Sequence, residues 1–280
     1  MTFESFTIFS NMSVNHYENF PVASILLPAK LRSSVATIYA FARSADDLAD
    51  EGDATPEERV ASLENYESEL NKLKHDEPTQ SSLFIELGRV INDQKLPLEP
   101  FYALLSAFKQ DVTTKRYQTF SELLDYCARS ANPVGQIMLA LYKETNEQNR
   151  KQSDDICTAL QLINFWQDVA IDWQKERIYI PFEDLRKHDV AETQISNNIV
   201  SEQWRALMRF ETMRARKILL EGSPLCKRLP GRIGWELRLV VQGGLRILER
   251  IDQCDGDVFR RRPKLALKDW FIMVWRAIRM

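Results

Sequence analysis

Apolar positions recur along most of the chain at the three- and four-residue spacing of an α-helix. This periodicity predicts helices over the ranges 31–50, 56–75, 79–92, 98–110, 119–144 with a break near Pro133, 151–173, 200–221 and 230–253. The nearest approach to a strand is the short stretch 177–181. We therefore expect an all-α fold.

Helix boundaries are marked by capping residues. Thr55, Pro56 and Glu58 combine a cap residue, a first-turn proline and an acidic side chain, which predicts a helix start at this point. Ser153 is the corresponding candidate for the helix over 151–173. The range 174–198 is the longest irregular stretch, and no linker or composition break divides the chain. We expect one domain over residues 1–280.

Composition supports this interpretation. Glycine is scarce, with 9 residues in 280, which favours long helices joined by few tight turns. The formal net charge is −3, but residues 227–280 hold 13 Lys and Arg against six Asp and Glu, which leaves −10 on the rest. A basic C-terminal region suits diphosphate groups or anionic lipid. Basic and aromatic residues do not interleave as in nucleic-acid modules, so we expect no nucleic-acid partner.

Two apolar helical segments are interrupted by aspartates four residues apart, Asp46 with Asp50 and Asp168 with Asp172. Residues i and i+4 share one face of a helix, where a pair of like charges is destabilising by about 0.2–0.5 kcal/mol. Such an arrangement, made twice in apolar surroundings, indicates that a cation compensates the carboxylates.

In the first segment, Val35, Tyr39, Ala42, Asp46 and Asp50 follow one helical face, so the aspartates continue a stripe that faces the core upstream. An exposed acidic helix end is the competing interpretation.

In the second segment, Gln161, Asn164, Asp168 and Asp172 lie on one face between apolar flanks. This pattern predicts a polar cavity inside a helical bundle, and a conventional exposed face is the competing interpretation.

The ligand types favour Mg²⁺ or Mn²⁺. Carboxylate and amide oxygens without histidine or cysteine partners suit these hard cations, whereas a di-iron bundle would need Glu-x-x-His pairs that the chain lacks. Mg²⁺ commonly binds through a few carboxylates together with substrate phosphates. A diphosphate substrate therefore completes the expected site.

The four cysteines are widely spaced, without a CxxC pair, as in reduced cytosolic thiols. With no secretory signal and no long uncharged apolar run, we expect a cytoplasmic protein. The tail 265–280 contains Trp270, Trp275 and basic residues. Two interpretations stay open for it: a peripheral contact with the inner face of the membrane, or a helix that closes the bundle.

Taken together, the segment 46–50 and the segment 161–181 resemble the paired signatures of the squalene/phytoene synthases. The resemblance runs from about His16 to Lys268, and the second segment, which ends in ERIYIP, is the specific one.

The resemblance implies a single-domain isoprenoid synthase bundle with a central cavity, in which both aspartate clusters bind Mg²⁺ that holds a prenyl diphosphate. Asp46, Asp50, Asp168 and Asp172 are then metal ligands, with Asn164 in the same site. The expected substrate-binding side chains are His16, Arg43, Arg177, Arg262, Gln161 and the ring of Tyr39.

Within the family, the ranges 16–22, 130–135 and 164–168 most resemble the hopanoid-pathway branch. Those enzymes ionise presqualene diphosphate and quench the rearranged cation with water to form hydroxysqualene, without NADPH. They would receive their substrate from a presqualene diphosphate synthase. Ala128 stands where related synthases have tyrosine, and Gln167 where many have arginine. We expect Ala128 to leave room for water and Asn132 or Gln167 to orient it.

Two alternatives remain. A member of the same family could condense two prenyl diphosphates head to head, as presqualene diphosphate, squalene and phytoene synthases do. A non-catalytic helical lipid- or partner-binding protein, with the aspartates as plain surface acids, is the alternative of another class.

Overall fold

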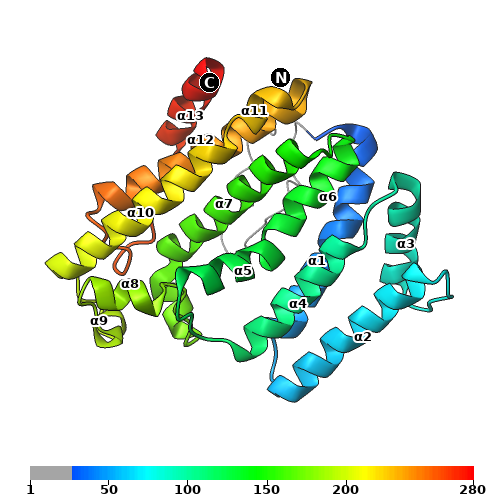
Figure 1. The fold of residues 1–280 in the computed structure, drawn as a ribbon, viewed down its shortest axis with the longest axis horizontal. Helices are drawn as coiled ribbons and strands as arrows, with labels where there is room; N and C mark the ends of the chain where they lie inside the picture. Colours follow the sequence, from blue (N-terminus) through cyan, green and yellow to red (C-terminus); the bar gives the residue numbers. More distant parts are fainter. Residues whose placement is uncertain (1–26) are drawn as a thin grey trace, which may run out of the picture.

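The computed structural model describes residues 27–280 as an arrangement of helices (Figure 1). Within these residues the only β-type pairing is one isolated parallel bridge between Arg116 and Ile178. A 3-10 turn, Ala29–Leu31, precedes the α-helices. These are α1 (Arg32–Asp50), α2 (Pro56–Lys74), α3 (Ser82–Gln94), α4 (Glu99–Thr113), α5 (Phe120–Ser130), α6 (Asn132–Tyr142), α7 (Glu147–Gln174), α8 (Phe182–Lys187), α9 (Glu192–Ser196), α10 (Glu202–Gly222), α11 (Leu225–Arg228), α12 (Gly231–Gln253) and α13 (Leu267–Arg279). The all-α prediction is confirmed.

Every long helix that the periodicity predicted is present. The capping residues at α2 act as expected: the Glu58 amide donates to Thr55 Oγ1 at 3.3 Å, and the Thr55 amide donates to the Glu58 carboxylate at 2.8 Å. The predicted break is also present, because α5 ends at Ser130 and Pro133 lies in the first turn of α6.

The predicted start of α7 at Ser153 is wrong. The helix begins at Glu147, because the side chain of Asn146 accepts a hydrogen bond from the Asn149 amide at 2.9 Å and caps it there. Ser153 is instead a buried residue inside the helix. The range 174–198, predicted to be irregular, contains the short helices α8 and α9, which are too brief for periodicity to reveal.

Helix α7 lies at the centre of the structure and packs mainly against α10 and α6 (Figure 1). One buried apolar cluster is built from α1 to α4 and α6, and a second from α5, α7, α10 and α12. Both aspartate clusters therefore lie on helices that belong to the packed interior.

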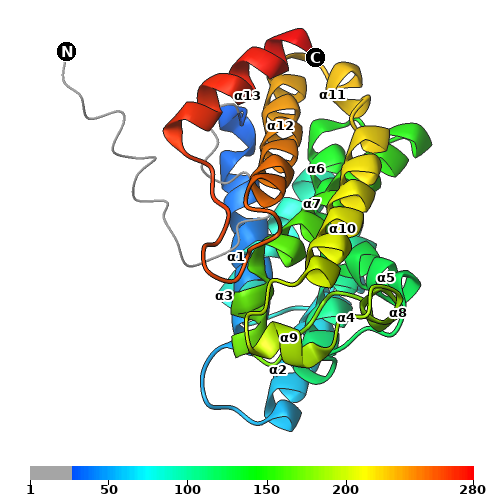
Figure 2. The ribbon, with the colours of Figure 1, turned by 90° about the vertical axis from the view of Figure 1, so that its left-hand side faces the viewer.

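The C-terminal helix α13 lies on the outside of the bundle and packs against α12 (Figure 2). Between residues 27 and 280, the helices all fall short of the length and apolar character that crossing a bilayer requires.

Candidate functional site

The first aspartate cluster occupies the C-terminal end of α1, where Asp46, Asp47 and Asp50 are half-buried. Arg43, one turn earlier on the same helix, lies 3.4 Å from Asp46 and 2.5 Å from Asp47. The predicted placement of Arg43 beside Asp46 is confirmed. The interpretation of this cluster as a plainly exposed helix end does not fit its partial burial.

Asp50 receives its partners from a distant part of the chain. Arg177 donates two hydrogen bonds to the Asp50 carboxylate, at 2.5 and 3.0 Å, and Lys175 donates a third at 3.0 Å. The same guanidinium donates to the backbone carbonyl of Asp111 at 3.0 Å. These contacts join the end of α1 to the segment that follows α7.

The second cluster lies on α7, where Asp168 is buried and Asp172 is half-buried. Asn164, one turn earlier, donates to Asp168 Oδ2 at 2.7 Å. Arg262, from the segment between α12 and α13, donates to both carboxylate oxygens of Asp168, with 2.9 Å from Nη2 to Oδ2. At Asp168 the polar stripe on α7 therefore faces another segment of the protein, unlike a conventional exposed face.

Burial and crowding shift the pKa values of these carboxyl groups. Burial raises the pKa of Asp172 to about 8, and the neighbouring charge of Asp168 adds to the shift. Burial, with the charge of Asp50, raises the pKa of Asp46 to about 6. Burial also acts on Asp50, but its bonds to Arg177 and Lys175 outweigh it and lower the pKa to about 2. The site thus combines the compensated Asp50 with Asp46 and Asp172, whose negative charge lacks a sufficient counter-charge.

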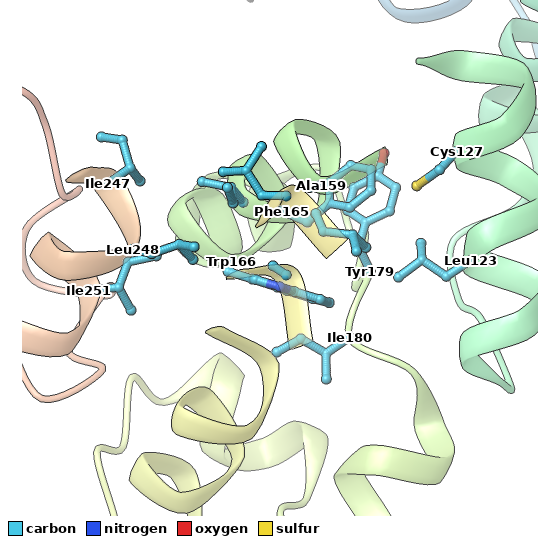
Figure 3. Close-up of a cluster of buried hydrophobic side chains, with 14 of the residues drawn as sticks. Leu123, Cys127, Ala159, Phe165, Trp166, Tyr179, Ile180, Ile247, Leu248 and Ile251 are labelled. Carbon is cyan, nitrogen blue, oxygen red and sulfur yellow. The ribbon is translucent and has the colours of Figure 1, made fainter. Parts of the chain in front are cut away.

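Arg177 is held in place by the segment that contains it. Glu176 adopts a left-handed φ of 59°, and the Arg177 amide donates to the Asp172 carbonyl at 2.9 Å, so the chain turns back at the end of α7. Two residues later, the ring of Tyr179 stacks on Phe165 of α7 at 3.8 Å between centroids (Figure 3). This stack fixes the segment, and Tyr126 extends it toward Asp111 by donating to Asp111 Oδ2 at 2.9 Å.

A cavity of about 390 Å³ lies alongside α7, between α6, α11 and α12. Its walls are mainly apolar and come from Val134, Met138, Leu160, Ile163, Leu237, Val240 and Ile247, among others. Asn164 and Gln167 also line it. Asn164 also donates to Asp168, so it connects the cavity wall to the aspartate cluster on α7. The arrangement provides an apolar chamber next to a charged site, within the usual size range of ligand pockets.

Gln167 is the predicted water-orienting residue that lines the cavity. Its amide nitrogen donates to the carbonyl oxygen of Pro263, which fixes the orientation of the side chain. Asn132 does not line the cavity; it is buried, and its Oδ1 accepts a hydrogen bond from Thr158 at 2.9 Å. Of the two predicted residues, Gln167 lines this cavity and Asn132 does not, and the water-orienting role stays a prediction.

The expectation for Ala128 is also corrected. Ala128 is exposed and does not line the cavity, because α5 turns Tyr126 and Cys127 toward the core and Ala128 away from it. Tyr39 is half-buried on α1 and packs against the apolar cluster of that half of the protein, and it is not part of the cavity wall.

Gln161 and His16 are the other two residues predicted to bind substrate. Gln161 is buried on α7 and its Oε1 has no hydrogen-bond partner, but the side chain does not line the cavity. His16 lies outside the described residues.

Sequence reasoning missed Lys175 and Glu236. Lys175 pairs with Asp50, and Glu236 lines the otherwise apolar cavity. A signal for Glu236 exists, since it shares a helical face with Ile233 and Val240 and so interrupts an apolar stripe. Lys175 has no such signal, because only the fold brings it to α1.

The residues of the two clusters fit Mg²⁺ or Mn²⁺. All candidate ligand atoms are oxygens, and Asp172 Oδ2 is buried without a hydrogen-bond partner. No group of three or more acidic, histidine or cysteine side chains converges on one point within residues 27–280. A bound ion would therefore complete its coordination with oxygens from the substrate and from water, as Mg²⁺ commonly does.

Known proteins resemble this chain along most of its length. A phytoene synthase from Arthrospira platensis is 30% identical over 275 residues, which cover 92% of this chain and 87% of that protein. A hydroxysqualene synthase from Zymomonas mobilis is 30% identical over 239 residues, covering 85% and 78%. Among solved structures, squalene synthase HpnC from Alicyclobacillus acidocaldarius superposes with a TM-score of 0.80 at 34% identity, covering 90% of this chain and 94% of that one.

The structural match confirms the predicted isoprenoid synthase fold. The sequence pattern of the squalene/phytoene synthase family matches residues 14–269. The chain belongs to the squalene/phytoene synthase family.

Proposed function

We propose that this protein ionises presqualene diphosphate and quenches the rearranged carbocation with water, which gives hydroxysqualene and diphosphate. The observation that carries the proposal is Gln167, a neutral amide that lines the apolar cavity next to Asp168. An arginine there would repel a nearby carbocation and could not accept a hydrogen bond, whereas a glutamine amide can do so. The hydroxysqualene synthase from Zymomonas mobilis supports the same assignment.

The diphosphate of the substrate would bind at the charged site next to the cavity, which Asn164 connects to the cavity wall. Asp46, Asp50, Asp168 and Asp172 would hold Mg²⁺, which as a Lewis acid stabilises the charge that develops on departing diphosphate. Arg177 and Arg262 already form two-pronged contacts with carboxylates there. Guanidinium groups pair equally well with phosphate, so both can orient the diphosphate and stabilise it as it leaves.

The hydrocarbon part of the substrate would occupy the apolar cavity between α6, α7 and α12. Apolar walls exclude bulk water, which protects a carbocation from early capture. Glu236 adds an acidic side chain to this wall and offers an attractive charge for a cationic intermediate.

Water capture requires one positioned water molecule. The nitrogen of the Gln167 amide is engaged by the Pro263 carbonyl, so the amide oxygen is directed to other donors. We assign to this oxygen the role of accepting a hydrogen bond from the attacking water, which places the water oxygen toward the cation. Asn132 has no part in this proposal.

A second reaction of the same family is favoured by a different observation. The phytoene synthase from Arthrospira platensis is as similar as the hydroxysqualene synthase and is covered more completely. In that alternative, the protein condenses two prenyl diphosphates head to head.

A substrate comparison separates the two reactions. Purified protein with Mg²⁺ and without NADPH is given presqualene diphosphate, farnesyl diphosphate or geranylgeranyl diphosphate, and products are identified by mass spectrometry. We expect turnover of presqualene diphosphate to a C30 alcohol. Consumption of farnesyl or geranylgeranyl diphosphate, with presqualene diphosphate left intact, would instead establish the condensation activity.

A further inference from the structure

Helix α13 presents its large apolar side chains to solvent. Leu267 and Phe271 are each 79% exposed, and Trp275 and Ile278 are 53% and 63% exposed. These residues lie on one helical face. The opposite face is buried against the protein and contains Asp269, Met273 and Ala277. This is the reverse of an ordinary surface helix, which buries its apolar stripe.

Ion pairs fix α13 in this orientation. The buried Asp269 carboxylate accepts hydrogen bonds from Arg246 and Arg250 of α12 at 2.7 Å, and from the Ala266 amide at 2.7 Å. Farther along, Arg276 contacts Glu249 of α12 at 2.5 Å. The helix is therefore attached by ion pairs at both ends of a buried face that also contains Met273 and Ala277, and these contacts direct the wider apolar face outward.

Basic residues border the exposed apolar face. Lys268 and Arg279 of α13 are exposed beside it, and the Arg279 guanidinium lies 3.7 Å from the centre of the Trp275 ring. The surrounding region 227–280 has a surplus of seven positive charges on a chain whose formal net charge is −3. Tryptophan and basic side chains next to an apolar face are typical of helices that lie in the headgroup region of a bilayer.

We propose that α13 docks the protein on an anionic phospholipid bilayer, with the helix lying in the plane of the interface. The basic border complements acidic headgroups, and Phe271 and Ile278 would enter the acyl region. A second copy of the chain is a poorer occupant, because a two-fold contact through this face would set its basic border against the same positive charges. With 13 residues, α13 is too short to span the bilayer.

This inference rests on α13 and its surroundings and does not depend on the reaction. It also has a structural consequence, because α12, to which α13 is attached, forms one wall of the cavity. The docked protein would hold that wall next to the membrane.

The test uses the full-length protein and sedimentation with vesicles of phosphatidylcholine alone or mixed with phosphatidylglycerol. We expect binding to the mixed vesicles that weakens as salt is raised. The double variant Phe271→Ser, Ile278→Ser should bind the mixed vesicles at least about tenfold more weakly than the wild type. Its matched control is Met213→Ser, Leu220→Ser on α10, which removes two apolar side chains that are also exposed and should leave binding unchanged.

A second variant pair, Lys268→Gln with Arg279→Gln, should weaken binding to the anionic vesicles while the melting temperature stays unchanged. The proposal is overturned if the protein does not bind these vesicles, or if the α13 variants bind like the wild type. It is also overturned if light scattering shows a dimer that Phe271→Ser, Ile278→Ser converts to a monomer, since the face would then be a contact between copies.

Discussion

Arg177 and Asp50 form a two-pronged ion pair, with 2.5 and 3.0 Å between their atoms, across 127 positions of the chain. Arg262 and Asp168 form a similar pair across 94 positions. Each aspartate cluster thus has one carboxylate compensated by an arginine from a distant segment. Guanidinium groups thus supply part of the positive charge that the repeated aspartate spacing predicts, and burial raises the pKa values of Asp46 and Asp172.

Asp168→Asn tests the role of the α7 cluster. The substitution keeps the size of the side chain and removes the charge that both Arg262 and a metal ion would need. We expect Mg²⁺-dependent release of diphosphate from the substrate to fall by about 100-fold or more. The matched control is Asp155→Asn on the same helix, whose pair with Lys151 lies at the surface and contributes little. Equal rates for the two variants would remove the α7 aspartates from the mechanism.

Gln167→Ala tests the capture of water. Without the amide oxygen, the attacking water loses the acceptor that orients it, so we expect a smaller share of alcohol among the C30 products. Ala128→Tyr serves as the control, because Ala128 is exposed on α5 and does not line the cavity. Product ratios are measured by gas chromatography with mass spectrometry. A shift caused by Ala128→Tyr but not by Gln167→Ala would reverse our assignment of these two positions.

The raised pKa of Glu211 predicts that the stability of the protein depends on pH. Burial raises its pKa from 4.5 to about 8; the nearby Arg214 opposes the shift and Asp184 adds to it. Between these two values the folded protein keeps a proton that the unfolded chain has lost, so the free energy of unfolding decreases as pH rises through this window.

Glu211→Gln imitates the protonated group, and the variant should gain stability relative to wild type as pH approaches 8. Denaturant unfolding at several pH values measures this difference. Glu221→Gln, at an exposed position of the same helix, should leave the pH profile unchanged. A stability difference between Glu211→Gln and wild type that stays constant across the window would show that Glu211 is ionised in the folded protein.

Gly222→Ala tests the close packing of α10 on α7. A β-carbon at Gly222 would lie 2.6 Å from the Gln152 carbonyl oxygen and 3.0 Å from the Ile156 amide, and backbone atoms cannot rotate away. We expect a loss of about 1–3 kcal/mol in the free energy of unfolding. Gly243→Ala on α12 meets only the flexible end of Met273 at 3.4 Å and should stabilise the protein by about 0.5–1 kcal/mol. A neutral Gly222→Ala would indicate a looser contact between α7 and α10.

The sequence predicted the fold well because helical periodicity is a local property. The polar stripe of α7 was also predictable, since Gln161, Asn164 and Asp168 share a face whatever surrounds the helix. Contacts between distant segments could not be predicted from this local periodicity. The pairing of Lys175 with Asp50, for example, depends on how α1 and the end of α7 meet, which spacing within either segment does not specify.

The direction in which a helical face points was the least predictable feature. We expected Ala128 to leave room for water in the site, yet the packing of Tyr126 and Cys127 turns it outward. The amphipathic pattern of α13 was visible in the sequence, but whether its apolar face is buried or exposed depends on the ion pairs of Asp269 with α12.

The central claim is that water terminates the reaction inside the cavity, and labelled water tests it most directly. Presqualene diphosphate is turned over by the protein with Mg²⁺, without NADPH, in ¹⁸O-enriched water, and the product is analysed by mass spectrometry. We expect a C30 alcohol that contains one ¹⁸O atom, formed in equal amount with diphosphate. An unlabelled hydrocarbon, or no turnover while two prenyl diphosphates are condensed, would contradict it.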